Sequence, residues 1–576
     1  MSLHADSAVH QPARPDVAGS TGATETPLPD HEAQDARWIR GLAAVCTAAA
    51  ILPIVVAALR AITRNWLPVG DDAYFALRAG DVLTEHHPLL GTWTSASLTA
   101  GVDMNNPGPL FFDALALPVK LGGDAGLVLG VSLINIGAIV GIAVVAYRQA
   151  GARAVVVAMT AAAALGWAMG SELLFSPWQP NALLFPALCF FVMVWALACG
   201  DLAVLPWAVG VASFIVQTHV GYAVVVPVLA AWGVGAGAVR LKRSGGPDQD
   251  RRALRGRVVR SAGAAAAVAL VCWAQPLHEQ LFGDGRGNLG RLLSSVGASG
   301  ETVGLSDAPR YVASVLALPP WWARPSMSET LVTGSQRPSL LASVVGLAVV
   351  VALLAAGLVV AVRARDNAGA AASATGLVMA GMAAVAVAAV PISLFGFAPS
   401  HQVLWLWPVG AFVTMAVLMA LTANRGGPFS GARMVLLTVL AVMLGALNVP
   451  SMNARLGPAD SAESMPAVRE LVSELAPLRA ERGVLVDLRE QRFAEPYSAP
   501  VMLELERLGV TWFVDDPGQL RQVGDRADEG DASVRLLIRE GDAAREAPPG
   551  ADRIAYAEGP GDMAVAVYTV PLIDGR

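Results

Sequence analysis

Two adjacent carboxylates, Asp71 and Asp72, follow shortly after the first long apolar segment of the chain, and Tyr74 lies two residues beyond them. Paired carboxylates can act as a general base and as a ligand for a hydroxyl group or a metal ion, because the crowding of like charges separates their pKa values. The same acids could instead cap a helix over residues 73–84, since acidic residues are favoured at helix N-termini. The pair therefore predicts proton-transfer chemistry beside a membrane, with a helix cap as the structural alternative.

Other side chains that suit a sugar or a phosphate occur in several connections between apolar segments. They are Tyr74 and Arg78 after the acidic pair, Asn106 in a turn rich in proline and glycine, Trp178 and Asn181, Gln217 and His219, and Arg286 and Asn288. Guanidinium groups match phosphate oxygens in geometry, so Arg78 and Arg286, together with His219, are candidates for binding a leaving phosphate. For His219 an interfacial polar role is the common alternative, and Arg286 is equally well explained as an interfacial anchor.

The elements that must position these residues are membrane-spanning helices. Hydrophobic residues make up 55% of the chain and charged residues 15%, a balance that a soluble domain does not need for its core. About eleven segments are long and apolar enough to cross a hydrocarbon core of about 30 Å. They span residues 41–59, 124–147, 154–171, 180–199, 202–218, 221–239, 261–276, 338–362, 370–394, 401–422 and 433–449. The four cysteines lie inside apolar runs without metal-ligand spacing, so they predict neither disulfides nor a zinc site.

The distribution of positive charge predicts how these segments are oriented. The short connections that would be cytoplasmic, at 148–153, 240–260, 363–365 and 425–433, all contain arginine or lysine, whereas 170–179, 217–220 and 395–400 contain neither. Cytoplasmic loops of membrane proteins carry such an excess of positive charge. We therefore expect a multi-pass protein of the cell membrane with a cytoplasmic N-terminus, and we expect the candidate site residues to lie outside.

The chain divides into three parts by composition. Residues 1–38 contain almost no large apolar side chain, so we expect a disordered cytoplasmic tail. Residues 39–450 form the predicted transmembrane domain, with long external loops at about 60–123 and 277–337. Residues 451–576 are rich in charge and contain short apolar strands at 483–487 and 510–515 around a helical segment at 497–508, which predicts a small extracytoplasmic α/β domain. This part lacks a GxGxxG or P-loop sequence, so nucleotide binding has no support.

Taken in order, these motifs resemble one family. The acidic pair, the Pro-Gly-Pro-Leu-Phe-Phe turn at 107–112, the Trp-x-Pro-Asn sequence at 178–181, the Gln-x-His turn at 217–219 and the Gln-Leu and Gly-Asn-Leu sequences at 280–289 are similar to those of the GT-C superfamily of integral membrane glycosyltransferases. The likeness covers roughly residues 40–300. It is greatest to actinobacterial members near the RgtA/B/C/D-like, dolichyl-phosphate-mannose mannosyltransferase and aminoarabinose transferase groups. The family often has Asp-Glu at the position of Asp71-Asp72, and commonly His at the position of Asn106.

The resemblance implies an inverting hexosyl- or pentosyltransferase that moves a sugar from a polyprenyl-phosphate donor to an envelope glycan, lipid or protein on the outer face of the membrane. Asp71 would deprotonate the acceptor hydroxyl, and Asp72 would orient the acceptor or bind a divalent cation such as Mg²⁺ or Mn²⁺. Two other functions remain open. A transporter or lipid flippase would need ionisable residues near the bilayer midplane, of which the spans have almost none. A non-catalytic envelope scaffold would instead rely on the C-terminal domain. Nucleic acid is not an expected partner.

Overall fold

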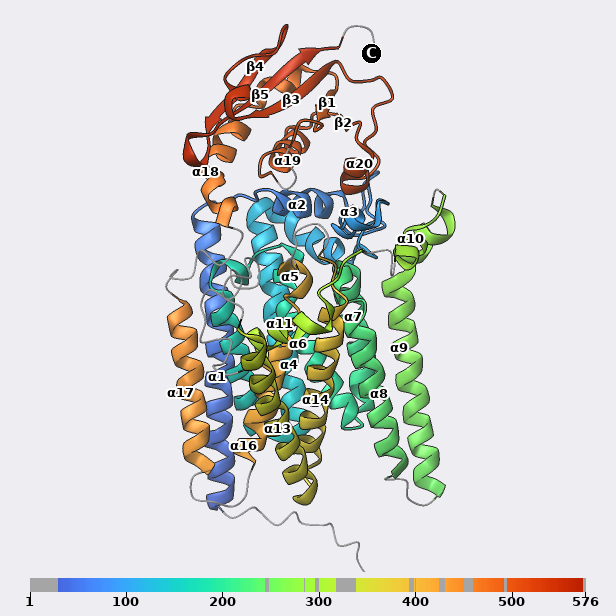
Figure 1. Cartoon of the computed structure of the whole chain (residues 1–576), viewed down its shortest axis with the longest axis vertical. Coiled ribbons are helices and arrows are strands. Elements are labelled where there is room, and N and C mark those ends of the chain that lie inside the picture. Colours follow the sequence, from blue (N-terminus) through green and yellow to red (C-terminus); the bar gives the residue numbers. More distant parts are fainter. Residues whose placement is uncertain are drawn as a thin grey trace, which may run out of the picture.

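The computed structural model describes residues 30–243, 248–283, 285–295, 300–317, 338–392, 398, 400–423, 430–449, 459–491 and 495–572. Long helices stand side by side along the long axis of the molecule, and the C-terminal domain covers one end of them (Figure 1). Nine described helical segments are long and apolar enough to cross a membrane. Their helices are α1 (Asp30–Thr63), α4 (Leu110–Met169), α5 with α6 (Gln179–Ala182 and Leu184–Ala198), α8 (Val225–Arg243), α9 (Asp248–Phe282), α13 (Leu340–Arg363), α14 (Asn367–Ala388), α16 (Leu406–Thr422) and α17 (Ser430–Asn448).

Helix α4 crosses the membrane twice. Its 60 residues would extend about 90 Å as one straight helix, three times the thickness of a hydrocarbon core. The backbone leaves the helical conformation at Gly123, Ala150 and Gly151, and both glycines have a positive φ, which glycine adopts at little cost. If α4 is counted as two spans at these breaks and the shorter apolar helix α7 (Leu205–Thr218) is added to the nine segments, the number equals the eleven crossings that the sequence predicts.

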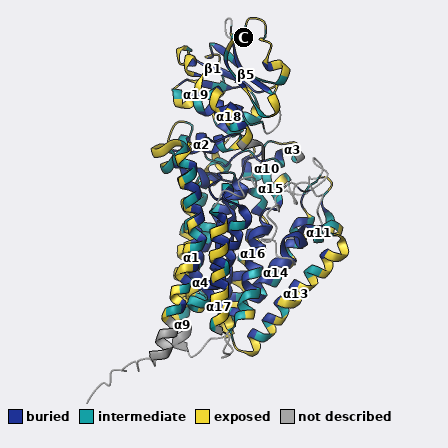
Figure 2. Ribbon diagram, turned by 90° about the vertical axis from the view of Figure 1, so that its left-hand side faces the viewer, coloured by how far each residue is buried: buried dark blue, intermediate teal, exposed yellow. Residues whose placement is uncertain are grey.

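Helix α6 lies in the centre of the bundle. All of its residues are buried, and it packs against α4, α7, α8 and α16. Helices on the outside, such as α9 and α13, instead expose large apolar side chains, among them Val271 and Leu341 (Figure 2). Exposed apolar helix faces suit a lipid surrounding, so the chain is a multi-pass membrane protein.

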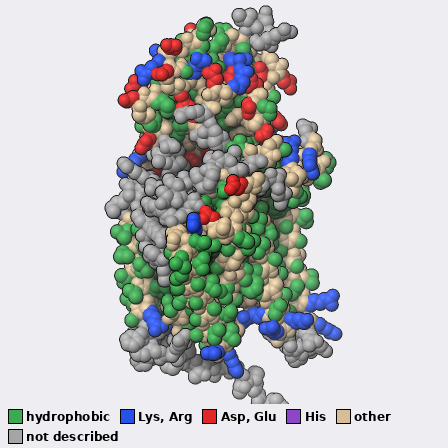
Figure 3. Space-filling model, viewed as in Figure 1, with side chains coloured by type: hydrophobic (Ala, Val, Ile, Leu, Met, Phe, Trp, Pro, Cys, Tyr) green, Lys and Arg blue, Asp and Glu red, His purple; other side chains and the backbone are tan. Residues whose placement is uncertain are grey.

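Charged side chains mark the two ends of the bundle. Hydrophobic side chains cover much of its visible side, while lysine and arginine gather at the end opposite the C-terminal domain (Figure 3). Helix α8 ends there with Arg240, Lys242 and Arg243, and α13 ends with Arg363. The end that carries the C-terminal domain is called the domain-bearing end below.

The C-terminal domain is a five-stranded mixed sheet with helices. It contains α18 (Ala459–Ser473), β1 (Val484–Asp487), α19 (Ser498–Leu508), β2 (Trp512–Val514), α20 (Pro517–Val523), β3 (Val534–Glu540), β4 (Asp552–Glu558) and β5 (Ala564–Pro571). The strand order is β2-β1-β3-β5-β4, with β1 parallel to β2 and β3, and β5 antiparallel to β3 and β4. The predicted strands at 483–487 and 510–515 and the predicted helix at 497–508 correspond to β1, β2 and α19. The small sheet domain is therefore confirmed.

Shorter helices connect the long ones, and some lie in segments that the sequence predicts as loops. They are α2 (Asp71–Asp81), α3 (Ala96–Ala100), α10 (Asn288–Ser295), α11 (Gly304–Leu316) and α15 (Ser400–Val403). Helix α11 lies inside the predicted loop at 277–337 and packs against α13, α14 and α16. Helix α1 begins at Asp30, inside the segment predicted as a disordered tail. Residues 1–29 and 318–337 lie outside the described residues.

Candidate functional site

Helix α2 carries the acidic pair at the domain-bearing end of the bundle. Its N-cap is Gly70, with a φ of 56°, a left-handed conformation that glycine adopts readily. Asp71 and Asp72 occupy the first turn instead, where the partial positive charge of a helix N-terminus favours carboxylates. Neither aspartate is the N-cap, so the alternative prediction that the acidic pair caps a helix is wrong. The helix that follows is Asp71–Asp81 rather than 73–84.

The two carboxyl groups have different surroundings. Asp71 is exposed, and the Trp178 side chain hydrogen-bonds to it. Although the side chain reaches solvent, the protein atoms around its carboxyl group desolvate it and raise the pKa of Asp71, and the hydrogen bond from Trp178 opposes this rise. Asp72 is partly buried; burial, and then the charge of Asp71, raise its pKa well above the usual range. Asp71 therefore ionises more readily than Asp72, which keeps its proton to higher pH.

Trp178 connects Asp71 to a pair of histidines. It precedes α5, and its ring lies edge-on to that of His401, in α15, with 6.4 Å between centroids. The His401 ring lies edge-on to that of His219 at 6.5 Å, and its Nε2 is 3.0 Å from Ser95 Oγ. Segments far apart in the sequence therefore meet in one group of side chains, which we call the Trp178–His401 cluster: Asp71, Ser95, Trp178, His219 and His401.

His219 has a defined tautomer within this cluster. It lies between α7 and a short 3₁₀ turn, and its Nδ1 accepts a hydrogen bond from the Gly221 amide at 3.1 Å. The neutral ring must then carry its proton on Nε2, which is the nitrogen free to donate. Burial is the main cause that lowers the pKa of His219, and proximity to His401 adds to it. His219 is thus a neutral hydrogen-bond donor near neutral pH.

The turn around Asn106 fixes the loop that lies beside these histidines. Asn106 Oδ1 accepts a hydrogen bond from the Val220 amide at 2.8 Å, and Asn106 Nδ2 donates to the Thr92 side chain at 3.1 Å. Gly108 is required for close approach, because a Cβ there would lie 2.2 Å from Gln217 Oε1. The predicted site residues Asn106 and Gln217 therefore lie next to His219 and support its turn.

Other predicted site residues bind the C-terminal domain instead. The Tyr74 hydroxyl donates to Gln519 Oε1 at 3.0 Å. Arg78 is buried, paired with Asp81, and donates to the Val523 carbonyl at 2.8 Å. These contacts hold α2 against α20 and occupy both side chains, so we assign Arg78 no role in phosphate binding.

Asn288 belongs to a second group that joins loop, helix and domain. It exchanges two hydrogen bonds with the Asn105 backbone, each 2.9 Å, and its Oδ1 also accepts from Arg521 of α20 at 3.1 Å. Arg286 lies exposed in the turn before α10, and Asn181 is buried, with its amide donating to Ser176 Oγ at 3.3 Å. No described contact brings these three residues to Asp71.

Sequence reasoning missed His401, Ser95 and Arg521. His401 carries the same signal as His219, a lone histidine at the end of an apolar segment, and could have been found by it. Ser95 and Arg521 carry no such signal, since a serine in a loop and an arginine in a charged domain are common.

The acidic pair offers too few ligands for a complete metal site. Within the described ranges no group of three or more His, Cys, Asp or Glu side chains could hold a metal ion. The acidic pair alone supplies at most two protein ligands for the divalent cation that the sequence suggests at Asp72, and the proposed mechanism does not use one.

Comparison with known proteins supports the fold. No protein-family model and no curated protein matches the chain. A crystal structure of ArnT from Cupriavidus metallidurans bound to undecaprenyl phosphate is similar, with a TM-score of 0.50 and 12% identity over 92% of this chain and 98% of that chain. The apo structure of the same protein matches with a TM-score of 0.33 and 13% identity over 86% and 92%. The first comparison shows an ArnT-like fold, in agreement with the GT-C resemblance of the sequence.

Proposed function

We propose that this protein is a membrane glycosyltransferase that takes a sugar from a polyprenyl-phosphate donor and transfers it to a cell-envelope glycan, lipid or protein. One observation carries the proposal. Trp178 hydrogen-bonds to the Asp71 carboxylate, and its ring contacts that of His401, which in turn contacts that of His219, at one end of an ArnT-like helical bundle. A base for the incoming hydroxyl and donors for the leaving phosphate are what such a transfer needs.

Asp71 is the base in this proposal. Its carboxylate is exposed, and the hydrogen bond from Trp178 stabilises its charged form. Asp72, whose pKa burial and the charge of Asp71 raise well above the usual range, orients the acceptor. Attack by the deprotonated acceptor oxygen on the anomeric carbon, from the side opposite the phosphate, forms the new glycosidic bond and breaks the bond to the phosphate oxygen. This displacement inverts the anomeric configuration.

The histidines receive the leaving phosphate. His219 is neutral and donates through Nε2, because its Nδ1 is held by the Gly221 amide. The His401 ring contacts those of both His219 and Trp178, so the two histidines belong to the same group of side chains as the tryptophan that binds Asp71. Neutral donors in a partly buried site stabilise developing negative charge without the desolvation cost of a buried cation.

The reaction takes place outside the cytoplasm in this proposal. Lysine and arginine gather at the end opposite the C-terminal domain (Figure 3), and that end is cytoplasmic if the usual charge bias holds. Eleven crossings then put the N-terminus inside and the C-terminal domain, with α2, outside.

The test is sugar transfer by membranes that contain Asp71→Asn or Asp72→Asn protein, with a polyprenyl-phosphate sugar as donor. We expect Asp71→Asn to lower turnover by about 10²–10⁴-fold, the usual contribution of a general base, and Asp72→Asn to have a smaller effect. Asp307→Asn, in a part-exposed ion pair on α11, is the matched control. Unchanged turnover in both variants of the acidic pair would refute the proposal.

A further inference from the structure

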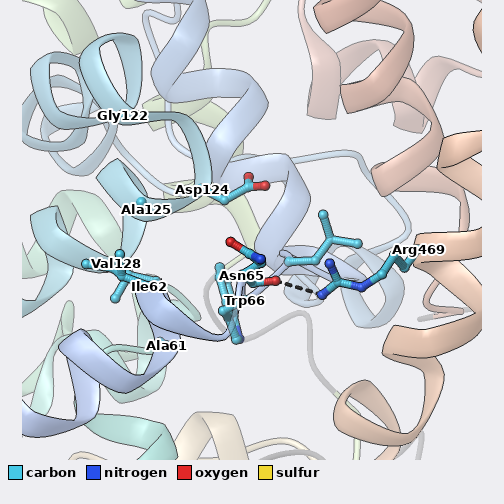
Figure 4. A pocket seen from close by; sticks show the side chains of 10 residues that line it. Ala61, Ile62, Asn65, Trp66, Gly122, Asp124, Ala125, Val128 and Arg469 are labelled. Carbon is cyan, nitrogen blue, oxygen red and sulfur yellow. Dashed lines mark hydrogen bonds between the residues drawn. The ribbon is translucent and has the colours of Figure 1, made fainter.

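A second site lies where α1, α4 and α18 meet. A pocket of about 250 Å³ opens there, and none of its lining residues belongs to the Trp178–His401 cluster (Figure 4). Ile62 and Val128, from two membrane-spanning helices, form its apolar part. Asn65, Asp124 and Arg469 form its polar part. The pocket is therefore amphipathic and lies at the level where the apolar bundle meets the C-terminal domain.

Arg469 is the cation available in this pocket. It is exposed on α18, and its Nη2 donates to the Asn65 carbonyl at 2.7 Å. Asn65 has a φ of 50°, a left-handed conformation that commonly follows a helix end, so the end of α1 presents this carbonyl to Arg469. A guanidinium has five N–H donors, and the Asn65 carbonyl needs one of them.

Asp124 does not neutralise Arg469 by itself, because it already has a partner. Its Oδ1 is paired with Arg507 of α19. Arg507 also lies 3.8 Å from Glu504, so Asp124 and Glu504 share Arg507, whereas the described hydrogen bond of Arg469 is to the Asn65 carbonyl and not to a carboxylate. Arginine binds phosphate oxygens in a two-pronged geometry, so the rim suits a phosphate group.

Lipid-facing surface continues from the apolar part of the pocket. Leu59 on α1 is 57% exposed, and Leu121 on α4, beside the lining residue Gly122, is 80% exposed. Trp66 lines the pocket at the same level, and tryptophan is enriched where membrane and water meet. A ligand with a phosphate group and long apolar chains would contact the rim of the pocket at Arg469 and the exposed apolar faces of α1 and α4 at once.

We propose that this pocket binds the headgroup of an anionic glycerophospholipid of the bilayer, with its phosphodiester on Arg469 and its acyl chains along α1 and α4. The volume agrees with a headgroup, since pockets for whole drug-sized ligands measure about 300–1,000 Å³. The lipid would join the ends of α1 and α4 to α18 of the C-terminal domain. This inference does not depend on the proposed transferase activity.

The test uses the full-length protein in detergent, with phosphatidylglycerol, diacylglycerol or undecaprenyl phosphate added, and measures the thermal midpoint and the lipid retained in native mass spectrometry. We expect phosphatidylglycerol to raise the midpoint by several degrees and to be retained, and we expect no effect from diacylglycerol, which has the same chains but no phosphate. Arg469→Gln should abolish both responses. Arg482→Gln, a change at another exposed arginine of the C-terminal domain, should keep them.

A second variant tests the pocket without changing its charge. Ala125→Leu places a larger side chain among the lining residues and should reduce retention of phosphatidylglycerol at least several-fold. Equal responses of wild-type and Arg469→Gln protein to phosphatidylglycerol would overturn the proposal. A response to undecaprenyl phosphate alone that Arg469→Gln removes would also overturn it, because the pocket would then be a carrier-lipid site.

Discussion

Arg526 of the C-terminal domain forms a two-pronged ion pair with Asp81, the last residue of α2. Its Nη2 lies 2.8 Å from Asp81 Oδ1 and its Nη1 lies 3.0 Å from Oδ2, and both side chains are at most 3% exposed. Asp81 also pairs with Arg78, so one buried carboxylate forms ion pairs with two arginines. At the other end of α2, the Gly70 amide donates to the Pro496 carbonyl at 3.1 Å. The domain thus holds both ends of the helix that carries Asp71.

Replacing Asp81 tests this attachment. Asp81→Asn removes the buried carboxylate that Arg78 and Arg526 share, and leaves Arg526 with the more exposed Glu506 as its ion-pair partner. Removing one partner of a buried pair costs about 3–5 kcal/mol. We expect a loss of stability of that order, together with a loss of sugar transfer, because α2 no longer holds Asp71 in place. Thermal unfolding and transfer assays on the same preparation measure both effects.

The control is an ion pair at the surface of the same domain. Glu490 is 68% exposed and pairs with Arg539, and such pairs contribute about 0–1 kcal/mol. Glu490→Gln should therefore leave stability and transfer nearly unchanged. If Asp81→Asn behaves like Glu490→Gln, the ion pair does not hold α2 in place.

The pH dependence of transfer should report the ionisation of Asp71. Burial raises the pKa of Asp71, so the acid side of the profile for kcat/KM should lie above the ordinary value for aspartate, about 3.9. Below that pKa the base is protonated and activity falls about tenfold per pH unit. Trp178→Phe removes the hydrogen bond that lowers this pKa, so the acid limb should move to higher pH.

A different tryptophan serves as the control for this shift. Trp232 donates its ring N–H to Thr375 Oγ1 at 3.0 Å, within the helical bundle. Trp232→Phe removes a comparable bond and should leave the acid limb unmoved. An acid limb that stays in place in Trp178→Phe would show that Asp71 is not the group that titrates.

Chelation tests whether sugar transfer depends on a divalent cation. The acidic pair supplies at most two protein ligands, and the pKa of Asp72 is raised well above its usual range by burial and by the charge of Asp71. We expect EDTA to change the rate of transfer less than twofold, and added Mg²⁺ or Mn²⁺ to have no larger effect. A rate that EDTA abolishes and Mg²⁺ restores would contradict this and would give the acidic pair a metal-binding role.

Local signals allowed most of the bundle to be predicted from the sequence. Long apolar runs and the arginine-rich connections indicate eleven crossings, and the predicted spans at 124–147 and 154–171 begin close to the breaks of α4 at Gly123 and Gly151. The position of Asp71 and Asp72 at a helix start also follows from residue types alone. These features depend on neighbours in the chain, which is why the sequence contains them.

The contacts between the helical bundle and the C-terminal domain could not be predicted in this way. Arg78 has the residue type of a phosphate ligand, yet Asp81 and the Val523 carbonyl bind it. Arg521 binds Asn105, and Arg526 binds Asp81 of α2, each across more than 400 positions of the sequence. Such pairings depend on how the domain is placed on the bundle, and no local pattern encodes that placement.

His401 provides the last test, because it lies between the tryptophan that binds Asp71 and the second histidine. Its Nε2 is 3.0 Å from Ser95 Oγ, and its ring contacts those of Trp178 and His219. His401→Phe keeps an aromatic ring but removes the nitrogen, and loss of one hydrogen bond of about 1.4 kcal/mol would lower kcat/KM about tenfold. His401→Gln retains a polar group near Ser95 and should lose less. Equal activity of the Phe variant and the wild type would limit His401 to packing, since the ring alone would then suffice.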